Sequence, residues 1–299
     1  MQVDIQHKVV IGTTKLGMPY GAIDQTQVDE SGVERIFSKA HQLGFNCFDT
    51  APSYGDAERL IGRYLAPELR SSCITKVAKI SSSRIQAQDL LAVDECFRLS
   101  LQNMQTHSCY GLLVHDVQDL DKSGAEKLLA WMQSLKQRGL VSKIGVSVYT
   151  PKEAEGLCQR FEFDLIQLPC NIFDQRFLLS GTIDRLAEAG IEVHARSLFL
   201  KGLLLKAYSC ADISESKMPR KLLKHAESFF ESMRQINIST YDSCLSFAKS
   251  QKAINRWVIG LSSEQQLARL LESDCNKQGL IDFGRWAFFE DAVLDPRTW

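Results

Sequence analysis

The feature that most constrains the fold of this chain is a regular alternation between short apolar runs and stretches with helical spacing. The runs have the length and composition of buried strands. They lie at Val9–Gly12, Asn46–Ala51, Cys73–Val77, Gly111–Asp116, Lys143–Val148, Asp164–Pro169, Glu192–Leu198 and Trp257–Gly260. Between them apolar side chains recur three and four residues apart, as at Val33, Ile36, Phe37 and Ala40. Strand–helix alternation of this kind predicts parallel strands joined by right-handed crossovers.

Eight such units fit a (β/α)8 barrel, an α/β fold of about 250 residues, so we expect a single TIM-barrel domain over residues 1–299. An open doubly wound sheet is the structural alternative. It would favour a Gly-x-Gly-x-x-Gly turn after the first strand, and the chain has none. Two regions depart from the alternation. Residues 202–240 form a long excursion that is a candidate substrate loop or lid, and the aromatic tail 281–299 would cover either the barrel mouth or the barrel exterior.

Composition narrows the class of protein. The net charge of -1 shows no bulk attraction to nucleic acid or to acidic membranes. No run approaches the roughly 18 uncharged apolar residues of a membrane-spanning helix, and the N-terminus lacks a secretory pattern, so we expect a cytoplasmic protein. The nine cysteines are scattered without a Cys-x-x-Cys pair. We therefore expect reduced thiols in the core and no metal site.

Four ionisable residues stand at or just beyond the ends of predicted strands: Asp49, Tyr54, Lys76 and His115. The carboxyl ends of barrel strands meet at one face, which is where such barrels carry their chemistry. An acid, a phenol, an amine and an imidazole that converge there would form a proton-delivery site.

The segments around these residues resemble the aldo-keto reductase family. Phe48–Gly55 reads Phe-Asp-Thr-Ala-Pro-Ser-Tyr-Gly, and Thr75-Lys76 and Leu113–Asp116 follow in the family's order. The resemblance continues at Ile144–Ser147, Ile166–Asn171 and Val258–Leu267. It implies a (β/α)8 barrel that binds NADPH or NADH without a Rossmann fold and transfers a hydride to an aldehyde or ketone, or the reverse.

The resemblance also assigns the catalytic roles, mapping the family's tetrad onto Asp49, Tyr54, Lys76 and His115. Tyr54 would be the acid, but a phenol with a pKa of about 10 releases its proton reluctantly near neutrality. The ammonium of Lys76 would lower that pKa, and Asp49 would hold Lys76 charged. His115 would donate a hydrogen bond to the carbonyl oxygen.

Cofactor contacts are implied in the same way. Positions matching Ser147 and Gln167 hold the nicotinamide carboxamide in the family, whereas Asn171 is either a further amide contact or a turn residue. After the seventh strand the family commonly has Tyr-Ser-Pro-Leu, and here the chain has Arg196 and Ser197 in the first two places. A guanidinium plane also stacks on rings. The adenine end would meet the residues after the last strand, namely Gly260, Ser262 and Gln266, with Arg269 further on.

The resemblance implies NADPH as the cofactor, with NADH as the alternative; hydroxyls and a helix N-terminus can bind the 2′-phosphate without a cation. A small aldehyde or ketone is the expected substrate, with contacts in the loop Phe199–Leu205, and a monomer is expected. The main functional alternative is a non-catalytic, cofactor-binding regulatory relative. A carboxylate-pair hydrolase would need two facing acids, and Asp49 alone stands at a motif position.

Overall fold

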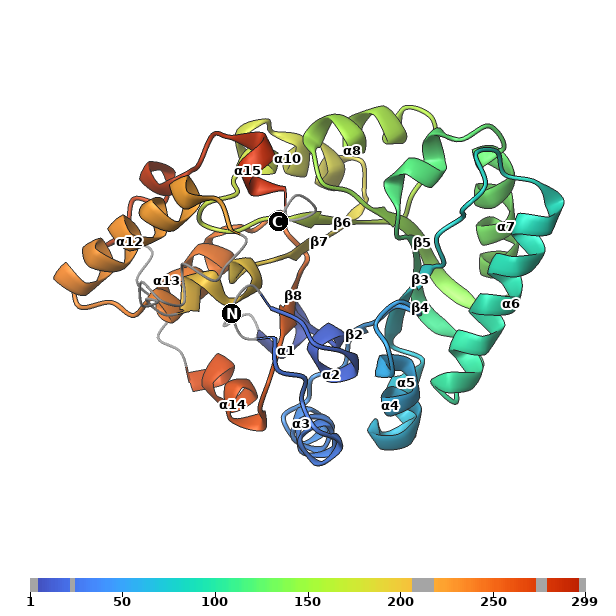
Figure 1. The fold of residues 1–299 in the computed structure, drawn as a ribbon, viewed down its shortest axis with the longest axis horizontal. Coiled ribbons are helices and arrows are strands. Elements are labelled where there is room, and N and C mark those ends of the chain that lie inside the picture. The colour runs from blue at the N-terminus through green and yellow to red at the C-terminus, as the bar shows by residue number, and fades with distance from the viewer. Residues whose placement is uncertain (1–4, 22–24, 206–217, 273–278, 296–299) are drawn as a thin grey trace.

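The computed structural model is a closed barrel in which eight parallel strands follow one another in chain order, β1 pairing with both β2 and β8 (Figure 1). It describes residues 5–21, 25–205, 218–272 and 279–295. The strands are β1 (Val9–Gly12), β2 (Phe48–Asp49), β3 (Cys73–Val77), β4 (Cys109–Val114), β5 (Val141–Ser147), β6 (Leu165–Pro169), β7 (Glu192–Arg196) and β8 (Arg256–Gly260). Each falls on a predicted run, which confirms the (β/α)8 barrel and excludes the open sheet. β2 is the shortest, because the chain leaves the sheet directly after Asp49.

Helices surround the strands (Figure 1). Those after β1 to β4 are α2 (Thr14–Gly17), α3 (Glu30–Gln42), α4 (Ala57–Tyr64), α5 (Pro67–Arg70), α6 (Ala87–Asn103), η1 (Val117–Asp121) and α7 (Ala125–Gln137), with α1 (Ile5–Lys8) preceding β1. Those after β5 to β8 are α8 (Pro151–Cys158), α9 (Arg176–Leu179), α10 (Thr182–Glu188), η2 (Leu200–Leu205), α12 (Arg220–Gln235), α13 (Thr240–Ser250), α14 (Glu264–Glu272), η3 (Gly284–Trp286) and α15 (Asp291–Leu294).

Local sequence signals explain where several helices begin. The Asp29 carboxylate accepts a hydrogen bond from the Gly32 amide at the start of α3. At the start of α8, Thr150 and Glu153 cap each other's backbone amides, and Pro151 occupies the first turn. These side chains satisfy amides that have no partner within the helix. The caps therefore define the residues at which α3 and α8 begin.

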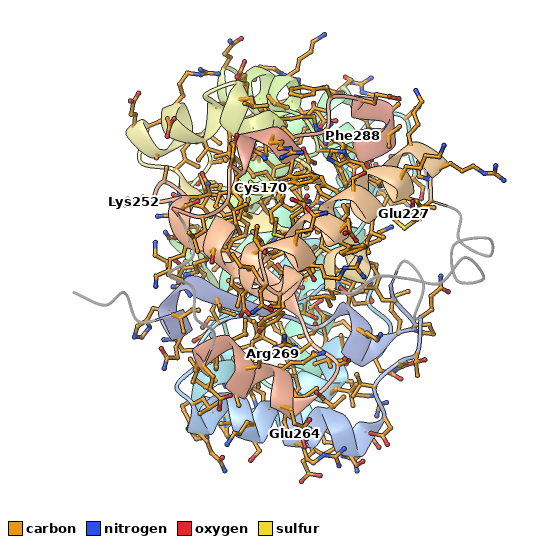
Figure 2. The ribbon with its side chains drawn as sticks, turned by 90° about the vertical axis from the view of Figure 1, so that its left-hand side faces the viewer. Cys170, Glu227, Lys252, Glu264, Arg269 and Phe288 are labelled. Carbon is orange, nitrogen blue, oxygen red and sulfur yellow. The ribbon has the colours of Figure 1, made fainter. Side chains whose placement is uncertain are left out.

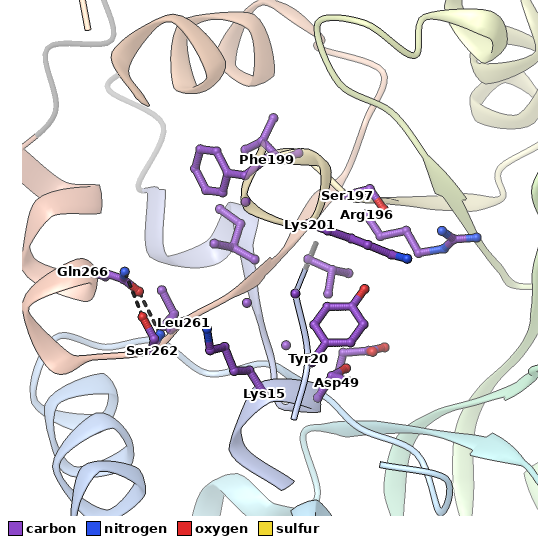
Figure 3. Close-up of a pocket in the computed structure, with 18 of the residues that line it drawn as sticks. Lys15, Tyr20, Asp49, Arg196, Ser197, Phe199, Lys201, Leu261, Ser262 and Gln266 are labelled. Carbon is purple, nitrogen blue, oxygen red and sulfur yellow. Dashed lines mark hydrogen bonds between the residues drawn. The ribbon is translucent and has the colours of Figure 1, made fainter. Parts of the chain in front are cut away.

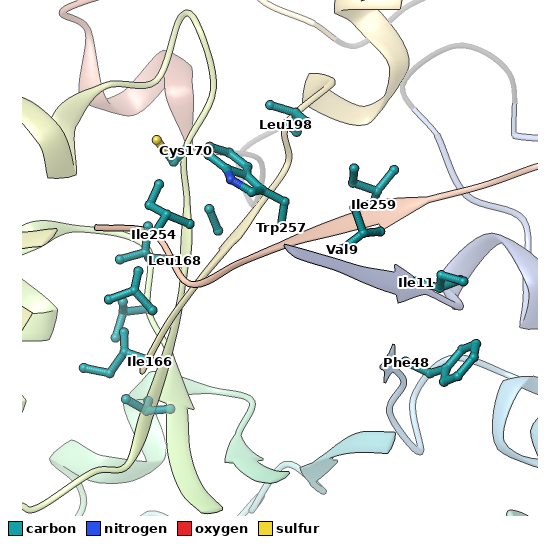
Figure 4. Packing of buried hydrophobic residues seen from close by; sticks show 14 of the residues in the cluster. Val9, Ile11, Phe48, Ile166, Leu168, Cys170, Leu198, Ile254, Trp257 and Ile259 are labelled. Atoms are coloured by element: carbon teal, nitrogen blue, oxygen red, sulfur yellow. The ribbon is translucent and has the colours of Figure 1, made fainter. Parts of the chain in front are cut away.

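The apolar core has two layers. A small cluster fills the inside of the barrel, and it consists of Val10, Cys47, Ile74, Leu113 and Leu165. A much larger one lies between the strands and the helices, where Leu168, Trp257 and Ile259 point outward (Figure 4). The alternation of inward and outward side chains along each strand produces both layers. The described cysteines are free thiols, most of them buried in these layers.

The two regions that interrupt the alternation are partly described. Residues 206–217 of the predicted loop 202–240 and residues 296–299 of the tail lie outside the described residues. Within the loop region the chain forms α12, and the tail packs against this helix through Trp286 and Phe288. The Trp286 ring lies 5.2 Å from that of Phe229, and the Phe288 ring lies 5.3 Å from that of His225. The described aromatic part of the tail thus covers the helical layer.

Candidate active site

A buried ion pair lies at the carboxyl end of the barrel. Lys76 of β3 places its Nζ 2.5 Å from Oδ2 of Asp49, the last residue of β2. The same ammonium donates to the Thr50 carbonyl at 3.1 Å, and Gln167 of β6 donates from Nε2 to Asp49 Oδ2 at 2.8 Å. The side chains of Lys76 and Asp49 are only 0% and 5% exposed. A charge that is this deeply buried requires such a partner.

Tyr54 and His115 stand next to this pair and face open space. Their rings meet edge to face, with centroids 5.8 Å apart and planes at 83°. Both line a cavity of about 640 Å³ that Asp49 also borders. Lys76 lies behind Asp49 and does not line the cavity. The structure therefore brings all four predicted catalytic residues together, with the phenol and the imidazole on the accessible side.

Close packing fixes the loop that carries Tyr54. Gly17 of α2 lies so near this loop that an added Cβ would sit 2.0 Å from the Tyr54 carbonyl oxygen, and Gly55 has a φ of +57°. The Asp56 amide donates to the Gly17 carbonyl at 3.2 Å. Asp56 occupies the N-cap position of α4, but its carboxylate pairs with Arg59 and caps no amide. Both glycines are thus needed for the position of the phenol.

The pKa of Tyr54 differs from the expectation. Burial, followed by the charge of Asp49, raises the pKa of Tyr54, while a hydrogen bond with Thr14 and the charge of Arg196 oppose this rise. The expected lowering by Lys76 is absent from the main contributions to this pKa. Burial, with Lys76 next, lowers the pKa of His115 to about 4. Near neutrality Tyr54 therefore keeps its proton and the imidazole of His115 is uncharged.

The residues predicted to contact a dinucleotide line the same cavity. They are Ser147, Gln167, Arg196, Ser197, Gly260, Ser262 and Gln266. Ser262 and Gln266 bond each other: the Ser262 amide donates to Gln266 Oε1 at 2.8 Å, and Gln266 Nε2 donates to Ser262 Oγ at 3.1 Å (Figure 3). A Cβ added to Gly260 would meet no atom within 4 Å, so the cavity wall is open at this glycine.

The segment after β7 is held from two sides. The Arg196 guanidinium lies 4.2 Å from the Tyr149 ring centroid, and its Nη2 donates to the Val148 carbonyl at 3.0 Å. Asn171 donates from Nδ2 to the Ser197 carbonyl at 3.1 Å, and its Oδ1 accepts from the amides of two residues that follow it. Asn171 therefore acts as a turn residue that supports Ser197, and it does not line the cavity.

Sequence reasoning did not identify several cavity residues. Lys15, Tyr20 and Tyr149 border the cavity without belonging to a predicted site, and Lys201 was included only as part of the range Phe199–Leu205. The Arg269 guanidinium also borders it and lies 4.0 Å from the Tyr241 ring centroid. The sequence signal for these cavity residues was only their position after a strand, since Lys15 and Tyr20 follow β1 and Tyr149 follows β5.

Two further findings concern the described part of the chain. No group of three His, Cys, Asp or Glu side chains in it could hold a metal ion. No helix there is long and apolar enough to cross a membrane.

Comparison with known proteins adds four findings. A model of the Aldo/keto reductase family matches residues 8–275. The aldo-keto reductase AKR11C1 from Bacillus halodurans, in its holo form, has the same fold, with 18% identity and a TM-score of 0.71 over 98% of this chain and 95% of that one. The glycerol dehydrogenase AKR11B4 from Gluconobacter oxydans is 21% identical, with a TM-score of 0.64 over 89% of this chain and 85% of that one. No curated protein sequence matches the chain significantly.

Proposed function

The chain belongs to the aldo/keto reductase family, and on this premise we propose that it is an NAD(P)H-dependent oxidoreductase that reduces an aldehyde or ketone to an alcohol. One observation carries the proposal. Tyr54 and His115 share an accessible cavity wall directly in front of the buried Asp49–Lys76 pair. A proton donor, a neutral hydrogen-bond donor and a fixed internal charge are the protein groups that carbonyl reduction requires.

Each of the four residues has a separate task. Tyr54 delivers the proton to the carbonyl oxygen, and its raised pKa means that the phenol holds this proton near neutrality until the substrate accepts it. His115 donates a hydrogen bond to the same oxygen, orients the substrate and stabilises the charge that develops there. Lys76 and Asp49 form a rigid pair behind them, and the Lys76 charge compensates the phenolate that remains after proton transfer.

The cavity wall fits a nicotinamide dinucleotide, which supplies the hydride when it is bound. Ser147 and Gln167 would hold the carboxamide, and the Asp49 carboxylate orients the Gln167 amide for this purpose. Arg196 and Ser197 would border the nicotinamide. Gly260, Ser262 and Gln266 would receive the adenine end, where Arg269 would add a cation next to a 2′-phosphate. NADPH is accordingly the proposed cofactor, with NADH as the alternative.

A titration followed by a turnover assay tests the proposal. Nicotinamide fluorescence would report binding of NADPH and of NADH, and absorbance would then report oxidation of the dinucleotide in a panel of small aldehydes and ketones. Binding followed by oxidation that Tyr54→Phe abolishes would support the reductase. Binding with no oxidation by any panel member would favour the non-catalytic, cofactor-binding relative. Binding of neither dinucleotide would refute both functions.

A small, uncharged or charged carbonyl compound is the proposed partner, and we propose a cytoplasmic monomer that contacts neither nucleic acid nor a membrane. The net charge of -1 supports the proposal that the protein contacts neither nucleic acid nor a membrane, because it provides no bulk attraction to a polyanion. Size-exclusion chromatography with light scattering tests the monomer, since a mass near twice 33.7 kDa would contradict it.

A further inference from the structure

His115 directly follows the last paired residue of β4. The register between β3 and β4 ends at Val77 and Val114. The imidazole nevertheless borders the cavity, where its ring meets that of Tyr54 edge to face. Its position therefore depends on the segment that follows it, namely Asp116 and η1, and on the contacts that hold this segment.

A tight turn beside His115 starts η1. The Gln118 amide donates to the Asp116 carboxylate at 3.1 Å, and the Asp119 amide donates to the Asp116 carbonyl at 3.0 Å. The Asp119 side chain that this turn presents is only 2% exposed. A carboxylate buried to this extent requires partners that compensate the loss of water. The partners of Asp119 therefore show what η1 is attached to.

An ion pair between Asp119 and Lys122 holds one residue of the loop after β3. Asp119 Oδ2 accepts from the Ile80 amide at 3.2 Å, and Asp119 Oδ1 lies 2.7 Å from Lys122 Nζ. Lys122 also donates to the Ile80 carbonyl. Both polar backbone groups of Ile80, which lies four residues after Lys76, are thus bonded to this pair. The pair therefore joins the chain that leaves β3 after Lys76 to the chain that leaves β4 after His115.

Two other contacts join the same loops. Lys79 pairs with Asp116 at 2.8 Å, but the Lys79 side chain is 69% exposed, and ion pairs in water contribute little. Farther along the chain, the Ile85 amide donates to the Ser123 carbonyl at 2.8 Å. Of the two enclosed contacts, the ion pair on Ile80 is the one closer in sequence to His115.

The electrostatics of His115 agree with an enclosed position. Burial, and next the charge of Lys76, lowers the pKa of its imidazole to about 4. The charges that mainly act on it are those of Lys76, Asp49, Arg196 and Asp116. Asp119 and Lys122 are not among them, so they affect His115 through its position. If the loop moved outward, solvent would reach the imidazole and its pKa would rise toward the ordinary value of about 6.5.

We propose that Asp119, together with Lys122, is a positioning residue for the reduction: it fixes the loops after β3 and β4 to each other, so that His115 stays enclosed and directed at the carbonyl oxygen. Neither residue of the pair lines the cavity, so both act through His115. This inference rests on the proposed reductase function, which gives His115 its task. A displacement of a catalytic group by about 1 Å lowers a rate by up to about 10²-fold, so the effect is measurable.

Two aspartates with the same kinds of partner provide a matched test. Asp164 also accepts from a backbone amide, that of Ile144 at 2.9 Å, and it pairs with Lys136 at 2.7 Å. It directly precedes β6 and so lies at the amino end of the barrel, away from the cavity wall. Asp119→Ala and Asp164→Ala therefore remove the same contacts from opposite ends, and both should unfold at a lower urea concentration than the wild type.

Two milder variants complete the set. Asp119→Asn keeps an oxygen that can accept from the Ile80 amide, so it should retain most of the wild-type behaviour. Glu227→Ala removes a carboxylate from the exposed surface of α12 and should behave as the wild type does (Figure 2).

Titration of the histidines followed by NMR tests the position of His115 without turnover. The ring Cε1–H signal that is missing from His115→Ala identifies the residue. We expect this signal to stay constant in the wild type between about pH 5 and 8, and the midpoint of its titration to rise by at least about 1 pH unit in Asp119→Ala. Loss of a carboxylate would by itself lower the pKa of a histidine, so a rise reports exposure to solvent. Asp164→Ala should leave the signal unchanged.

Kinetics then test the link to catalysis. With NADPH and benzaldehyde, Asp119→Ala should lower kcat/KM by about tenfold or more, while the dissociation constant for NADPH changes less than about threefold. In the His115→Ala background the same substitution should cost less than about twofold, because no imidazole remains to be positioned. Equal losses in the two backgrounds would show that Asp119 acts on the fold as a whole, and would overturn the proposal.

The NMR result decides the proposal if benzaldehyde is not reduced, an outcome that counts against the reductase function alone. A rise in the His115 midpoint that occurs in Asp119→Ala and not in Asp164→Ala would support the positioning role. A His115 signal that does not move in Asp119→Ala, although this variant is less stable to urea, would refute it. An equal rise in Asp164→Ala would refute it as well, because it would reflect a general loosening of the barrel.

Discussion

The barrel contains two polar clusters built from the same four kinds of side chain, one at each end. At the carboxyl end an acid, a lysine, a tyrosine and a histidine form the candidate active site. At the amino end stand Glu192, Lys143, Tyr110 and His194, joined by Arg256. None of these five residues lines the cavity. The comparison shows that the residue types alone do not define a catalytic site.

The clusters differ in how their hydrogen bonds are used. At the amino end every partner converges on one carboxylate: Tyr110 donates to Glu192 Oε2 at 2.7 Å, His194 Nε2 lies 2.6 Å from Oε1, and Lys143 pairs with Oε2. Arg256 adds a contact of 3.5 Å. At the carboxyl end Lys76 and Gln167 both bond Asp49, and the Tyr54 and His115 rings face the cavity. The amino-end cluster, called the floor cluster below, uses its polar groups on one another. The carboxyl-end cluster leaves a phenol and an imidazole for a ligand.

Replacing the two tyrosines should produce the largest contrast. Tyr54→Phe removes the proton donor, so we expect the turnover number to fall by about 10²- to 10⁴-fold while the dissociation constant for NADPH changes little. Tyr110→Phe is the matched control, since it removes the same hydroxyl from the floor cluster and should leave turnover unchanged. Stopped-flow measurement of dinucleotide oxidation gives the turnover number of each variant, and nicotinamide fluorescence gives its dissociation constant for NADPH. Turnover retained by Tyr54→Phe would exclude it as the acid.

Replacing the two carboxylates should separate stability from activity. Glu192→Gln leaves Lys143 and Arg256 without their carboxylate, and we expect a loss of about 2–3 kcal/mol in the free energy of unfolding, because the cluster is largely buried. Its turnover should stay within about twofold of the wild type, because no floor residue borders the cavity. Asp49→Asn should reverse this pattern, with turnover affected most. Urea denaturation and the same kinetic assay measure the two effects. If Glu192→Gln lost activity without losing stability, the floor cluster would not be a purely structural one.

Acid should weaken the floor through Glu192. Burial alone would raise the pKa of this carboxyl, but hydrogen bonds from His194, Lys143 and Tyr110 outweigh burial and hold the pKa well below its ordinary value of 4.5. A group whose pKa is lowered by folding stabilises the protein above its unfolded pKa, and this contribution is lost as the pH falls through the folded value. We therefore expect the stability difference between the wild type and Glu192→Gln to shrink below about pH 4.5. Urea midpoints between pH 3 and 7 would show it, and a constant difference would contradict the assignment.

Much of this arrangement was predictable from the sequence, and the reasons for the limits are physical. The period of the apolar residues determined the barrel, and Asp49, Tyr54, Lys76 and His115 were identified because each stands at a strand end within a motif. The floor cluster was not predicted, because Lys143 and Glu192 are the first residues of apolar runs, where charged side chains are usually exposed to solvent. Their convergence depends on barrel closure, which brings strands distant in sequence to one axis.

The cavity charges were harder to predict for a different reason. Lys201 enters the cavity because Leu200 and Lys201 adopt left-handed backbone conformations, which no residue type at these positions favours. The direction of the Tyr54 pKa was missed as well. Proximity of an ammonium predicts a lowered pKa, but the effect of burial and of Asp49 depends on distances that a sequence does not contain.

The pH dependence of catalysis should give the smallest effect and the finest test of the comparison. Burial and Lys76 lower the pKa of His115 to about 4, so the imidazole remains neutral over the range in which an ordinary histidine, with a pKa of about 6.5, would titrate. The raised pKa of Tyr54 keeps its proton in place over the same range. We therefore expect kcat/KM for reduction of an uncharged aldehyde to vary less than about twofold between pH 5.5 and 8. A profile with a limb near pH 6.5 that disappears in His115→Gln would show that the imidazole is exposed to solvent, and that the carboxyl-end cluster is less enclosed than its geometry indicates.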